Sequence, residues 1–290
     1  MPADTETSAP DTLLHVRGLN VTFGRDPNPV FAVKGATFDL GRERLGIVGE
    51  SGSGKSTLGR AIMRLHPKNA RITADAMQFM GTDLLSLSEA AMSRLRGSDI
   101  SLILQDPRYS LNPVQPVGEQ IAEVAEVHLG LKGKASRAAA AEMLAAVRIR
   151  DIERTMGLYP HEISGGMGQR VMIAMMLLNK PKLVIADEPT SALDVSVRSD
   201  VLTLLDNLVR ENASGLILIS HDIRMVARFC DRIIVMYAGR MVEEITSLDA
   251  ARHPYTLGLI AAMPSLDGPR PDRLPVLDRQ LLAQMKESAI

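Results

Sequence analysis

The sequence has a single cysteine, Cys230, among its 290 residues. A disulfide framework and a four-cysteine metal or iron–sulfur site within this chain are therefore both excluded. The chain also has almost no net charge, because 33 Lys and Arg residues stand against 34 Asp and Glu residues. This balance disfavours a protein held on nucleic acid by a broad basic face, although a local basic patch stays open.

The apolar runs in the sequence are short. Val171 to Leu178 gives eight residues before Asn179, whereas a membrane-spanning helix needs about twenty. The N-terminal region lacks the positively charged segment and apolar core of a secretion signal. We therefore expect a chain that is soluble by itself and that takes part in membrane processes only through a partner.

The most informative stretch is LGIVGESGSGKST at residues 45–57. Its apolar start predicts a buried strand, and a helix is predicted from the lysine onward. Gly49, Gly54, Lys55 and Ser56 fit the phosphate-loop pattern G-x-x-x-x-G-K-[ST]. Glycines let several backbone N–H groups point at one anion, and the helix N-terminus adds partial positive charge. Lys55 can reach the β- and γ-phosphates, and the Ser56 hydroxyl can ligate Mg2+, so the stretch indicates a nucleoside triphosphate site.

The rest of the chain reads as a mixture of strands and helices. Alternating apolar residues at 13–23 and 31–40 predict an antiparallel β layer ahead of the phosphate-loop strand. Residues 116–155 read as helical, without a strand signal, and the helix after the phosphate loop is expected to reach Leu65. Short apolar runs separated by helices indicate a parallel sheet covered on both faces; they lie at 99–104, 183–186, 216–219 and 233–236.

Unusual residues follow four of the predicted strands, namely Gly49, Gln105, Asp187 and His221. Ligands of a parallel sheet bind at the carboxyl ends of its strands, so these residues are expected to share one site. A phosphoryl-transfer site needs a carboxylate near Mg2+ and a group that orients or deprotonates the attacking water. Asp187 fits the first role and Glu188 fits the second. The competing interpretations are an exposed acidic turn for the carboxylates and a structural histidine for His221.

In order along the chain, these motifs resemble those of the ATP-binding cassette (ABC) ATPase family. GESGSGKST at 49–57 resembles its Walker A motif, and Gln105 in LILQDP resembles its Q-loop. SGGMGQR at 164–170 resembles its signature motif, and LVIADEPTSALD at 183–194 resembles Walker B with the D-loop. His221 in LISHD resembles the switch histidine. The resemblance implies an α/β fold, with a P-loop NTPase (RecA-like) core, an N-terminal antiparallel β layer and an α-helical ABC subdomain.

The resemblance also implies roles for individual residues in an ATPase that uses ATP and Mg2+. Glu188, His221 and Gln105 are expected to be catalytic. Ser56, Gln105 and Asp187 are expected to hold the metal ion. Phe23 looks like the aromatic that stacks on adenine, although a plain core position is equally open. The residues expected to bind nucleotide are Phe23, Gly49, Glu50, Ser51, Gly52, Ser53, Gly54, Lys55, Ser56, Thr57, Ser164, Gly165, Gly166, Gln169 and Asp194.

The predicted domain organisation follows from the same resemblance. Residues 12–264 are expected to form the ABC ATPase domain, within which 107–175 form the helical subdomain that carries the signature motif. Residues 1–11 are polar and contain proline, and they read as a disordered tail. Residues 265–290 are expected to form a C-terminal extension. In this family the signature loop of one subunit acts on the nucleotide that its partner subunit holds.

Three longer stretches resemble the ATPase subunits of oligopeptide, dipeptide and nickel importers; these are LQDPRYSLNPVQPVGEQIAE, YPHEISGGMGQRVMIAM and HPYTLGLIAAMPS. The run MSRLRGSDISLILQDP resembles the D-type subunit of this group. The resemblance implies a subunit that powers uptake of peptides or a related small solute at the cytoplasmic face of the bacterial inner membrane. The implied partners are a second ATPase subunit (an F-type relative or another copy), two membrane permeases and, indirectly, an extracytoplasmic solute-binding protein. No nucleic-acid partner is expected.

Two departures from that group are visible. Gly168 stands where the group usually has Arg or Lys, so we expect a weakened signature function. The tail after Pro264 has no cysteine, so the iron–sulfur cluster of many relatives cannot form there. The identity of the cargo stays open among peptides, nickel and opine-like solutes.

The main alternative is a soluble ABC ATPase that acts on nucleic acid or ribosomes. It is disfavoured because only the 58 residues from 106 to 163 separate the Q-loop from the signature, with no heptad run, and because the chain has one cassette. A third interpretation, a nucleotide-binding regulator without hydrolysis, conflicts with the presence of Glu188 and His221.

Overall fold

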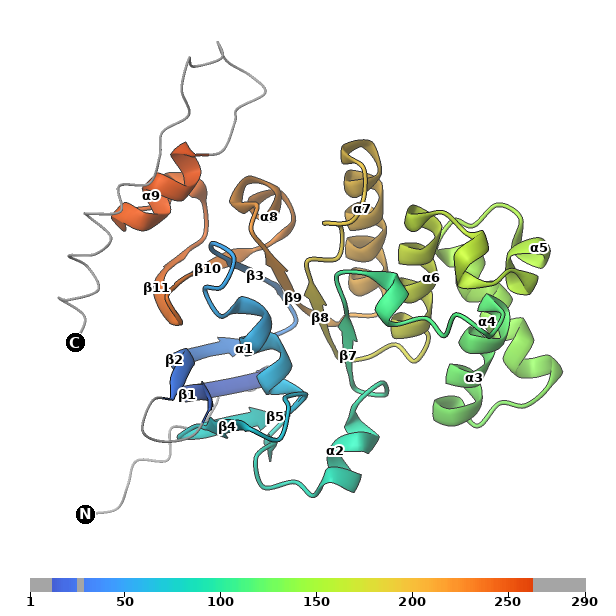
Figure 1. The fold of residues 1–290 in the computed structure, drawn as a ribbon, viewed down its shortest axis with the longest axis horizontal. Helices are drawn as coiled ribbons and strands as arrows, with labels where there is room; N and C mark the ends of the chain where they lie inside the picture. The colour runs from blue at the N-terminus through green and yellow to red at the C-terminus, as the bar shows by residue number, and fades with distance from the viewer. Residues whose placement is uncertain (1–11, 25–28, 263–290) are drawn as a thin grey trace, which may run out of the picture. The chain divides into compact units, whose positions relative to one another are not determined.

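The computed structural model describes residues 12–24 and 29–262 (Figure 1). These residues form two compact units. Unit 1 contains residues 12–15, 39–43 and 77–217, and unit 2 contains residues 16–24, 29–38, 44–76 and 218–262. The tail predicted at 1–11 and the extension predicted at 265–290 lie outside the described residues. None of the helices in the described ranges is both long and apolar enough to cross a membrane.

The N-terminal β layer is formed mainly by β1 (Leu14–Phe23), β2 (Val30–Leu40) and β4 (Ala70–Thr73). In this sheet β2 and β4 both pair with β1, and the β1–β4 pair is antiparallel. Inward-facing residues of β1 are fully buried, whereas their neighbours in the strand are only partly covered. This burial alternates because successive side chains of a strand point to opposite faces. The predicted β layer ahead of the phosphate loop is therefore confirmed.

The second sheet of unit 2 contains β3 (Arg44–Val48), β10 (Arg232–Tyr237) and β11 (Arg240–Ile245). β3 runs parallel to β10, and β10 forms an antiparallel pair with β11. Helices α1 (Lys55–Ile62), α8 (Ile223–Phe229) and α9 (Pro254–Ala261), with the short 3-10 helix Leu248–Ala250, complete the unit. In Figure 1, α1 directly follows the turn after β3, as the phosphate-loop pattern predicts.

Gly46 lies in the middle of β3, where α8 packs closely against the strand. A Cβ atom added at this glycine would lie 2.1 Å from Val226 Cγ1 and 3.4 Å from Cys230 Sγ. Glycine is therefore required at position 46 because the side chain of Val226 lies so close to its Cα. The backbone conformation does not require glycine, because it is that of an ordinary strand.

We expect Gly46→Ala to lower the free energy of unfolding by about 1–3 kcal/mol, because a buried methyl group would overlap Val226. Adding Val226→Ala should recover part of that loss, with a coupling of about 1–2 kcal/mol between the two sites. Urea unfolding of the wild type, both single variants and the double variant measures this coupling. Strictly additive effects would contradict the contact.

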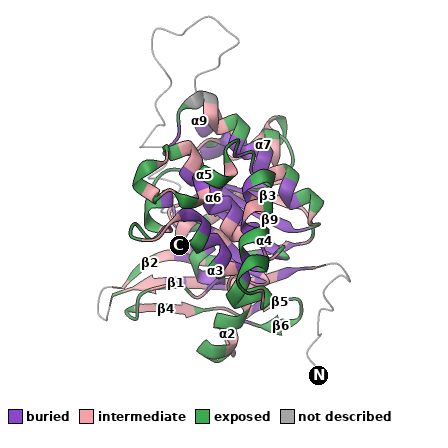
Figure 2. Cartoon of the chain, turned by 90° about the vertical axis from the view of Figure 1, so that its right-hand side faces the viewer, coloured by how far each residue is buried: buried purple, intermediate pink, exposed green. Residues whose placement is uncertain are grey.

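Unit 1 contains the strand pair β7 (Ile100–Ile103) and β8 (Leu183–Asp187), which are parallel and in register from Ile100 with Leu183. Every residue of β8 is buried, and so is every residue of β9 (Gly215–Ser220), which begins in unit 1 and ends in unit 2. Figure 2 shows this contrast in burial, with β9 buried and α2 (Glu89–Leu95) mainly exposed. The predicted parallel arrangement of fully apolar strands is confirmed for β3–β10 and β7–β8.

Between β7 and β8 the chain is helical and contains no strand. Its helices are α3 (Val117–Leu129), α4 (Lys134–Ala146), α5 (Ile152–Gly157) and α6 (Gly165–Leu177), with 3-10 turns at Pro107–Tyr109 and Pro160–Glu162. All of them belong to the same compact unit as β7 and β8. The division of residues 107–175 into a separate subdomain therefore stays a prediction. Helix α7 (Val195–Glu211) follows β8.

Several short elements differ from the sequence-based expectations. The helix after the phosphate loop ends at Ile62 and not at Leu65, because Arg64 takes a left-handed conformation with φ 52° and Leu65 N–H bonds back to Arg60 O at 2.9 Å. The strand expected over 99–104 is limited to Ile100–Ile103. Sequence patterns missed the edge strands β4 and β11 and the two-residue strand β6 (Thr82–Asp83), which pairs with β5 (Ala76–Phe79).

Candidate functional site

The phosphate loop lies in unit 2, between the last residue of β3, Val48, and the first residue of α1, Lys55. Gly52 and Gly54 have φ values of 80° and 101°, which favour glycine. A Cβ atom added at Gly49 would lie 2.1 Å from Met236 O, and one added at Gly54 would lie 2.3 Å from Ala32 O. The glycines of the pattern are therefore required by backbone approach as well as by backbone conformation.

The side chain of Lys55 is folded into this loop. Lys55 is 4% exposed. Its Nζ donates to Gly49 O at 2.8 Å, to Glu50 O at 2.7 Å and to Ser53 Oγ at 3.4 Å. A buried ammonium group costs free energy unless polar groups surround it, and here the carbonyl groups of the loop do so. The loop thus holds a fixed positive charge beside the first turn of α1, which is the chemistry that a phosphate group requires.

A residue outside the phosphate-loop pattern also contacts the loop. Tyr255, the second residue of α9, is fully buried, and its hydroxyl accepts a hydrogen bond from Glu50 N–H at 2.9 Å. Its ring packs on that of Tyr237, with the centroids 4.5 Å apart. Burial raises the pKa of Tyr255 to about 12, so the hydroxyl is neutral at ordinary pH. The sequence showed Tyr255 only as part of the HPYT stretch, and no local pattern linked that stretch to the loop.

Two other predicted residues of unit 2 are His221 and Phe23. His221 is exposed and directly follows β9, while Asp222 caps α8 by accepting from Met225 N–H at 2.9 Å. Phe23 ends β1 and meets His66 edge to face, with ring centroids 5.7 Å apart. His66 Nε2 in turn donates to Thr57 O at 3.0 Å, at the end of the Walker A stretch. The role of Phe23 against adenine stays a prediction.

The Walker B carboxylates lie in unit 1 at the end of β8. Asp187 is 4% exposed, and Glu188 is partly exposed with a left-handed φ of 48°. Such a conformation is strained for a glutamate and is held here by the turn that follows, because Ser191 N–H and Oγ–H both donate to Glu188 O at 3.2 and 3.1 Å.

The Q-loop residue Gln105 is exposed, two residues after β7. The turn after it is fixed by Asp106, which accepts from Arg108 N–H at 2.9 Å and binds the Arg108 guanidinium through both carboxylate oxygens. These hydrogen bonds lower the pKa of Asp106. The segment therefore carries an ordered ion pair at its surface immediately after Gln105.

The signature motif forms the start of α6. Ser164 is the N-cap, and its Oγ accepts from Met167 N–H at 3.3 Å. A Cβ atom at Gly165 would meet nothing within 4 Å, so this face of the helix start is open. Gly168 instead faces Pro107, whose ring carbon would lie 3.3 Å from an added Cβ. Gln169 is fully buried, and its amide has no hydrogen-bond partner among the described residues.

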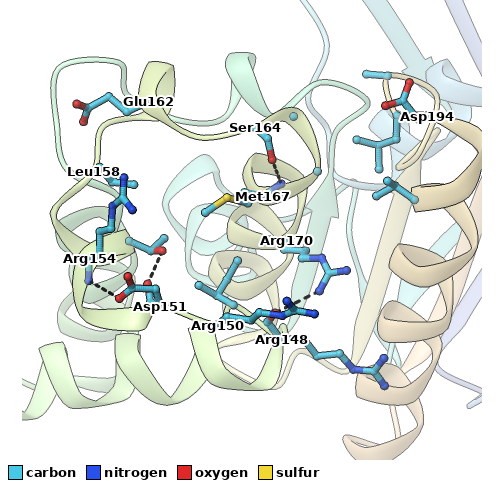
Figure 3. Close-up of a pocket in the computed structure, with 17 residues that line it drawn as sticks. Arg148, Arg150, Asp151, Arg154, Leu158, Glu162, Ser164, Met167, Arg170 and Asp194 are labelled. Atoms are coloured by element: carbon cyan, nitrogen blue, oxygen red, sulfur yellow. Dashed lines mark hydrogen bonds between the residues drawn. The ribbon is translucent and has the colours of Figure 1, made fainter.

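A pocket of about 1080 Å3 opens beside the signature motif, entirely within unit 1. Figure 3 shows Ser164 and Asp194 among the residues that line it. It also shows arginines from α5, from α6 and from the loop between α4 and α5. Arg170 donates to Val147 O and Arg148 O at 3.2 and 3.4 Å, so it also binds carbonyl groups that follow the C-terminal end of α4. The helix N-terminus and the arginine side chains make this pocket suited to an anion. The arginines that line it are Arg148, Arg150, Arg154 and Arg170.

The described structure thus distributes the predicted residues between the two units. The phosphate loop, Phe23 and His221 belong to unit 2. The hydrogen bonds from Lys55 to Gly49 O and Glu50 O therefore lie within that unit. Gln105, Asp187 and Glu188 belong to unit 1, together with the signature residues and Asp194. The metal ligands expected from sequence, Ser56, Gln105 and Asp187, carry hydroxyl, amide and carboxylate oxygens, which suit Mg2+.

The comparisons with known proteins agree with the motifs. The family model described as ABC transporter matches residues 33–191. The chain is 47% identical to the oligopeptide transport ATP-binding protein OppD of Salmonella typhimurium, over 91% of this chain and 81% of that protein. It is also 47% identical to the dipeptide transport ATP-binding protein DppD of Haemophilus influenzae, over 87% of this chain and 78% of that protein.

Solved structures give the same result for the fold. The dimeric structure of MJ0796, a bacterial ABC transporter cassette, has a TM-score of 0.72 and 27% sequence identity, and the match covers 80% of this chain and 98% of that chain. A post-hydrolysis dimer of the same cassette with ADP and Pi has a TM-score of 0.69, with the same identity and the same coverage of both chains. The predicted P-loop NTPase fold is confirmed. The chain therefore belongs to the ABC transporter family, among the ATP-binding subunits related to those of oligopeptide and dipeptide transporters.

Proposed function

We propose that this chain is the ATP-hydrolysing subunit that powers uptake of peptides, or of a related small solute, through a membrane ABC importer. The observation that carries the proposal is the buried Lys55 ammonium, held by Gly49 O and Glu50 O inside a glycine loop between β3 and α1. In a member of this family, that arrangement is a ready site for the phosphates of ATP. The peptide cargo is inferred from the oligopeptide and dipeptide transport relatives.

Different residues of this chain carry separate roles in ATP binding and hydrolysis. The loop amides and Lys55 bind the phosphates, and Phe23 lies on the adenine. Glu188 accepts a proton from the attacking water, and His221 donates to the γ-phosphate. Ser56, Gln105 and Asp187 are the residues that would hold a Mg2+ ion, and the ion would supply positive charge that offsets the charge of the phosphates.

The signature face completes the site of a partner subunit. Ser164 and Gly165 leave the start of α6 open to a ligand, and the pocket beside them is lined by four arginines. A nucleotide seated between two subunits stabilises their association by mass action. Two solved structures of one cassette with the same fold are dimeric. The partner here is a related F-type subunit or a second copy of this chain.

The membrane subunits dock on the surface that follows the Q-loop. Tyr109, Val114 and Val127 expose large apolar side chains there, with 86%, 80% and 68% of their surfaces open. Large apolar side chains that are exposed on this part of the chain favour a protein interface. The occupant is a cytoplasmic helix of a permease, which places the chain at the cytoplasmic face of the bacterial inner membrane.

Co-purification tests the proposed assembly. The 290-residue chain, expressed with any permeases and second ATPase that neighbouring genes encode, is expected to purify with them in detergent. Tyr109→Ser combined with Val114→Ser should reduce recovery of the permeases without reducing ATP binding. Recovery of the chain with RNA, DNA or ribosomes in place of permeases would contradict the proposal and favour the soluble ATPase alternative.

A further inference from the structure

We propose that Tyr255 is a positioning residue for the phosphate loop. Its hydroxyl fixes the orientation of the Gly49–Glu50 peptide group and thereby raises the affinity of the loop for ATP. The proposal rests on the nucleotide site proposed above. It assigns a role to the HPYT stretch, His253–Thr256, because none of its four residues belongs to the nucleotide site proposed above.

Tyr255 and Lys55 bind the same peptide group from its two ends. Glu50 N–H donates to the Tyr255 hydroxyl at 2.9 Å, and Gly49 O of the same peptide accepts from Lys55 Nζ at 2.8 Å. A peptide group that follows a glycine turns easily, because glycine has no Cβ to restrict ψ. These two hydrogen bonds select one orientation for it.

The two hydrogen bonds respond differently when nucleotide binds. Lys55 must turn toward the β- and γ-phosphates, so its bond to Gly49 O weakens or breaks. The bond from Glu50 N–H to Tyr255 does not involve the lysine and can persist. Tyr255 therefore keeps the first peptide of the loop in place while the lysine changes partner.

The start of α9 is built to hold Tyr255 in this position. His253 caps the helix through Nδ1, which accepts from Tyr255 N–H at 3.2 Å, and Pro254 is the first helical residue. Glu243 of β11 accepts from the N–H groups of Arg252 and His253 at 2.6 and 2.9 Å, which ties the helix start to the sheet. Because the Tyr255 ring is fully buried, its hydroxyl has little freedom to leave Glu50.

A purely structural tyrosine and a positioning tyrosine predict different results. If the hydroxyl only completes a buried hydrogen bond, its loss lowers stability and leaves the affinity of the folded protein for ATP unchanged. If it selects the competent loop orientation, its loss lowers the competent fraction, and the apparent Kd rises by the inverse of that fraction. Turnover at saturating ATP is then preserved, because bound nucleotide restores the orientation.

Tyr255→Phe in the full-length chain tests the proposal. We expect the Kd for ATP, measured with a fluorescent ATP analogue and by competition with ATP, to rise about fivefold. In the assembled importer we expect KM for ATP to rise by a similar factor, with kcat within about twofold of the wild type. The melting temperature reports how far the variant is destabilised.

Leu259→Ala is the matched control on the same helix. Leu259 is buried in α9 and its truncation removes packing while it leaves the Tyr255 hydroxyl in place. We expect it to lower the melting temperature more than Tyr255→Phe does and to leave the Kd for ATP unchanged. A Kd that follows the melting temperature across both variants would overturn the positioning role.

Lys55→Ala separates failure of this inference from failure of the proposed site. If Lys55→Ala loses ATP binding but Tyr255→Phe keeps the wild-type Kd and KM, the positioning role is wrong and the nucleotide site stands. If Lys55→Ala keeps tight binding, the nucleotide does not use this loop, and both proposals are wrong.

Discussion

Glu188→Gln is expected to reduce the rate of ATP hydrolysis by at least about a hundredfold, because glutamine cannot accept a proton from the attacking water. ATP binding should be retained, since the substitution leaves Lys55 and the backbone of the phosphate loop unchanged. The substitution keeps the size and hydrogen-bonding shape of the side chain. The strained backbone at φ 48° should therefore persist in the variant.

The expected consequence of binding without hydrolysis is a trapped complex of two ATPase subunits. Size-exclusion chromatography of the purified subunits with ATP measures this association, and release of phosphate measures turnover. Glu142→Gln, at an exposed position on α4, is the matched control and should behave as the wild type. Wild-type turnover by Glu188→Gln would show that another group activates the water.

Lys55→Ala is expected to weaken ATP binding by roughly a hundredfold or more. The buried ammonium group would make charge-assisted hydrogen bonds to the β- and γ-phosphates, and alanine can make none of them. The variant also leaves Gly49 O and Glu50 O without the partner that holds them 2.8 and 2.7 Å from Nζ. The loop loses both its charge and part of its internal order.

Equilibrium binding of a fluorescent ATP analogue measures this loss. Lys68→Ala is a suitable control, because Lys68 is exposed in the same unit and lies outside the phosphate loop. The control should bind as the wild type does, which excludes a general effect of net charge. Wild-type affinity in Lys55→Ala would remove the basis for placing the nucleotide at this loop.

The parts of the fold that the sequence predicted are those that local rules determine. The phosphate loop could be predicted because glycine, lysine and helix start occur at a fixed spacing within one short segment. The Ser164 cap follows a local rule of the same kind, since an N-cap serine binds an N–H group three residues later. The strands β8 and β9 were evident because burial on both faces leaves their interiors apolar, with polar residues only at their carboxyl ends, Asp187 and Ser220.

The parts that sequence reasoning missed depend on contacts between distant segments. Tyr255 reaches the loop across 205 positions of sequence, so no local pattern could indicate it. Gln169 was grouped with nucleotide-binding residues by its place in the signature motif, yet its side chain is fully buried here. β11 is an edge strand whose side chains lack the alternation that identifies a half-buried strand. β4 has only four residues and none of them is buried, so its sequence carries little apolar signal.

Gly168 illustrates a sequence departure that the structure explains in part. Its backbone faces the Pro107 ring, and a Cβ atom would lie 3.3 Å from that ring. The glycine therefore allows close contact between the signature helix and the turn after the Q-loop. Ser164 and Gly165 keep their capping and open positions beside it, which supports the expectation that signature function is weakened and not abolished.

The proposal that this chain hydrolyses ATP to power peptide uptake is tested by one measurement. That measurement is the rate of ATP hydrolysis by the assembled importer in lipid vesicles, with and without peptide-loaded solute-binding protein. We expect peptide to raise the rate several-fold for the wild type, and we expect neither Lys55→Ala nor Glu188→Gln to respond. A wild-type rate that peptide leaves unchanged, or hydrolysis that persists in Glu188→Gln, would contradict the proposed ATP-driven uptake.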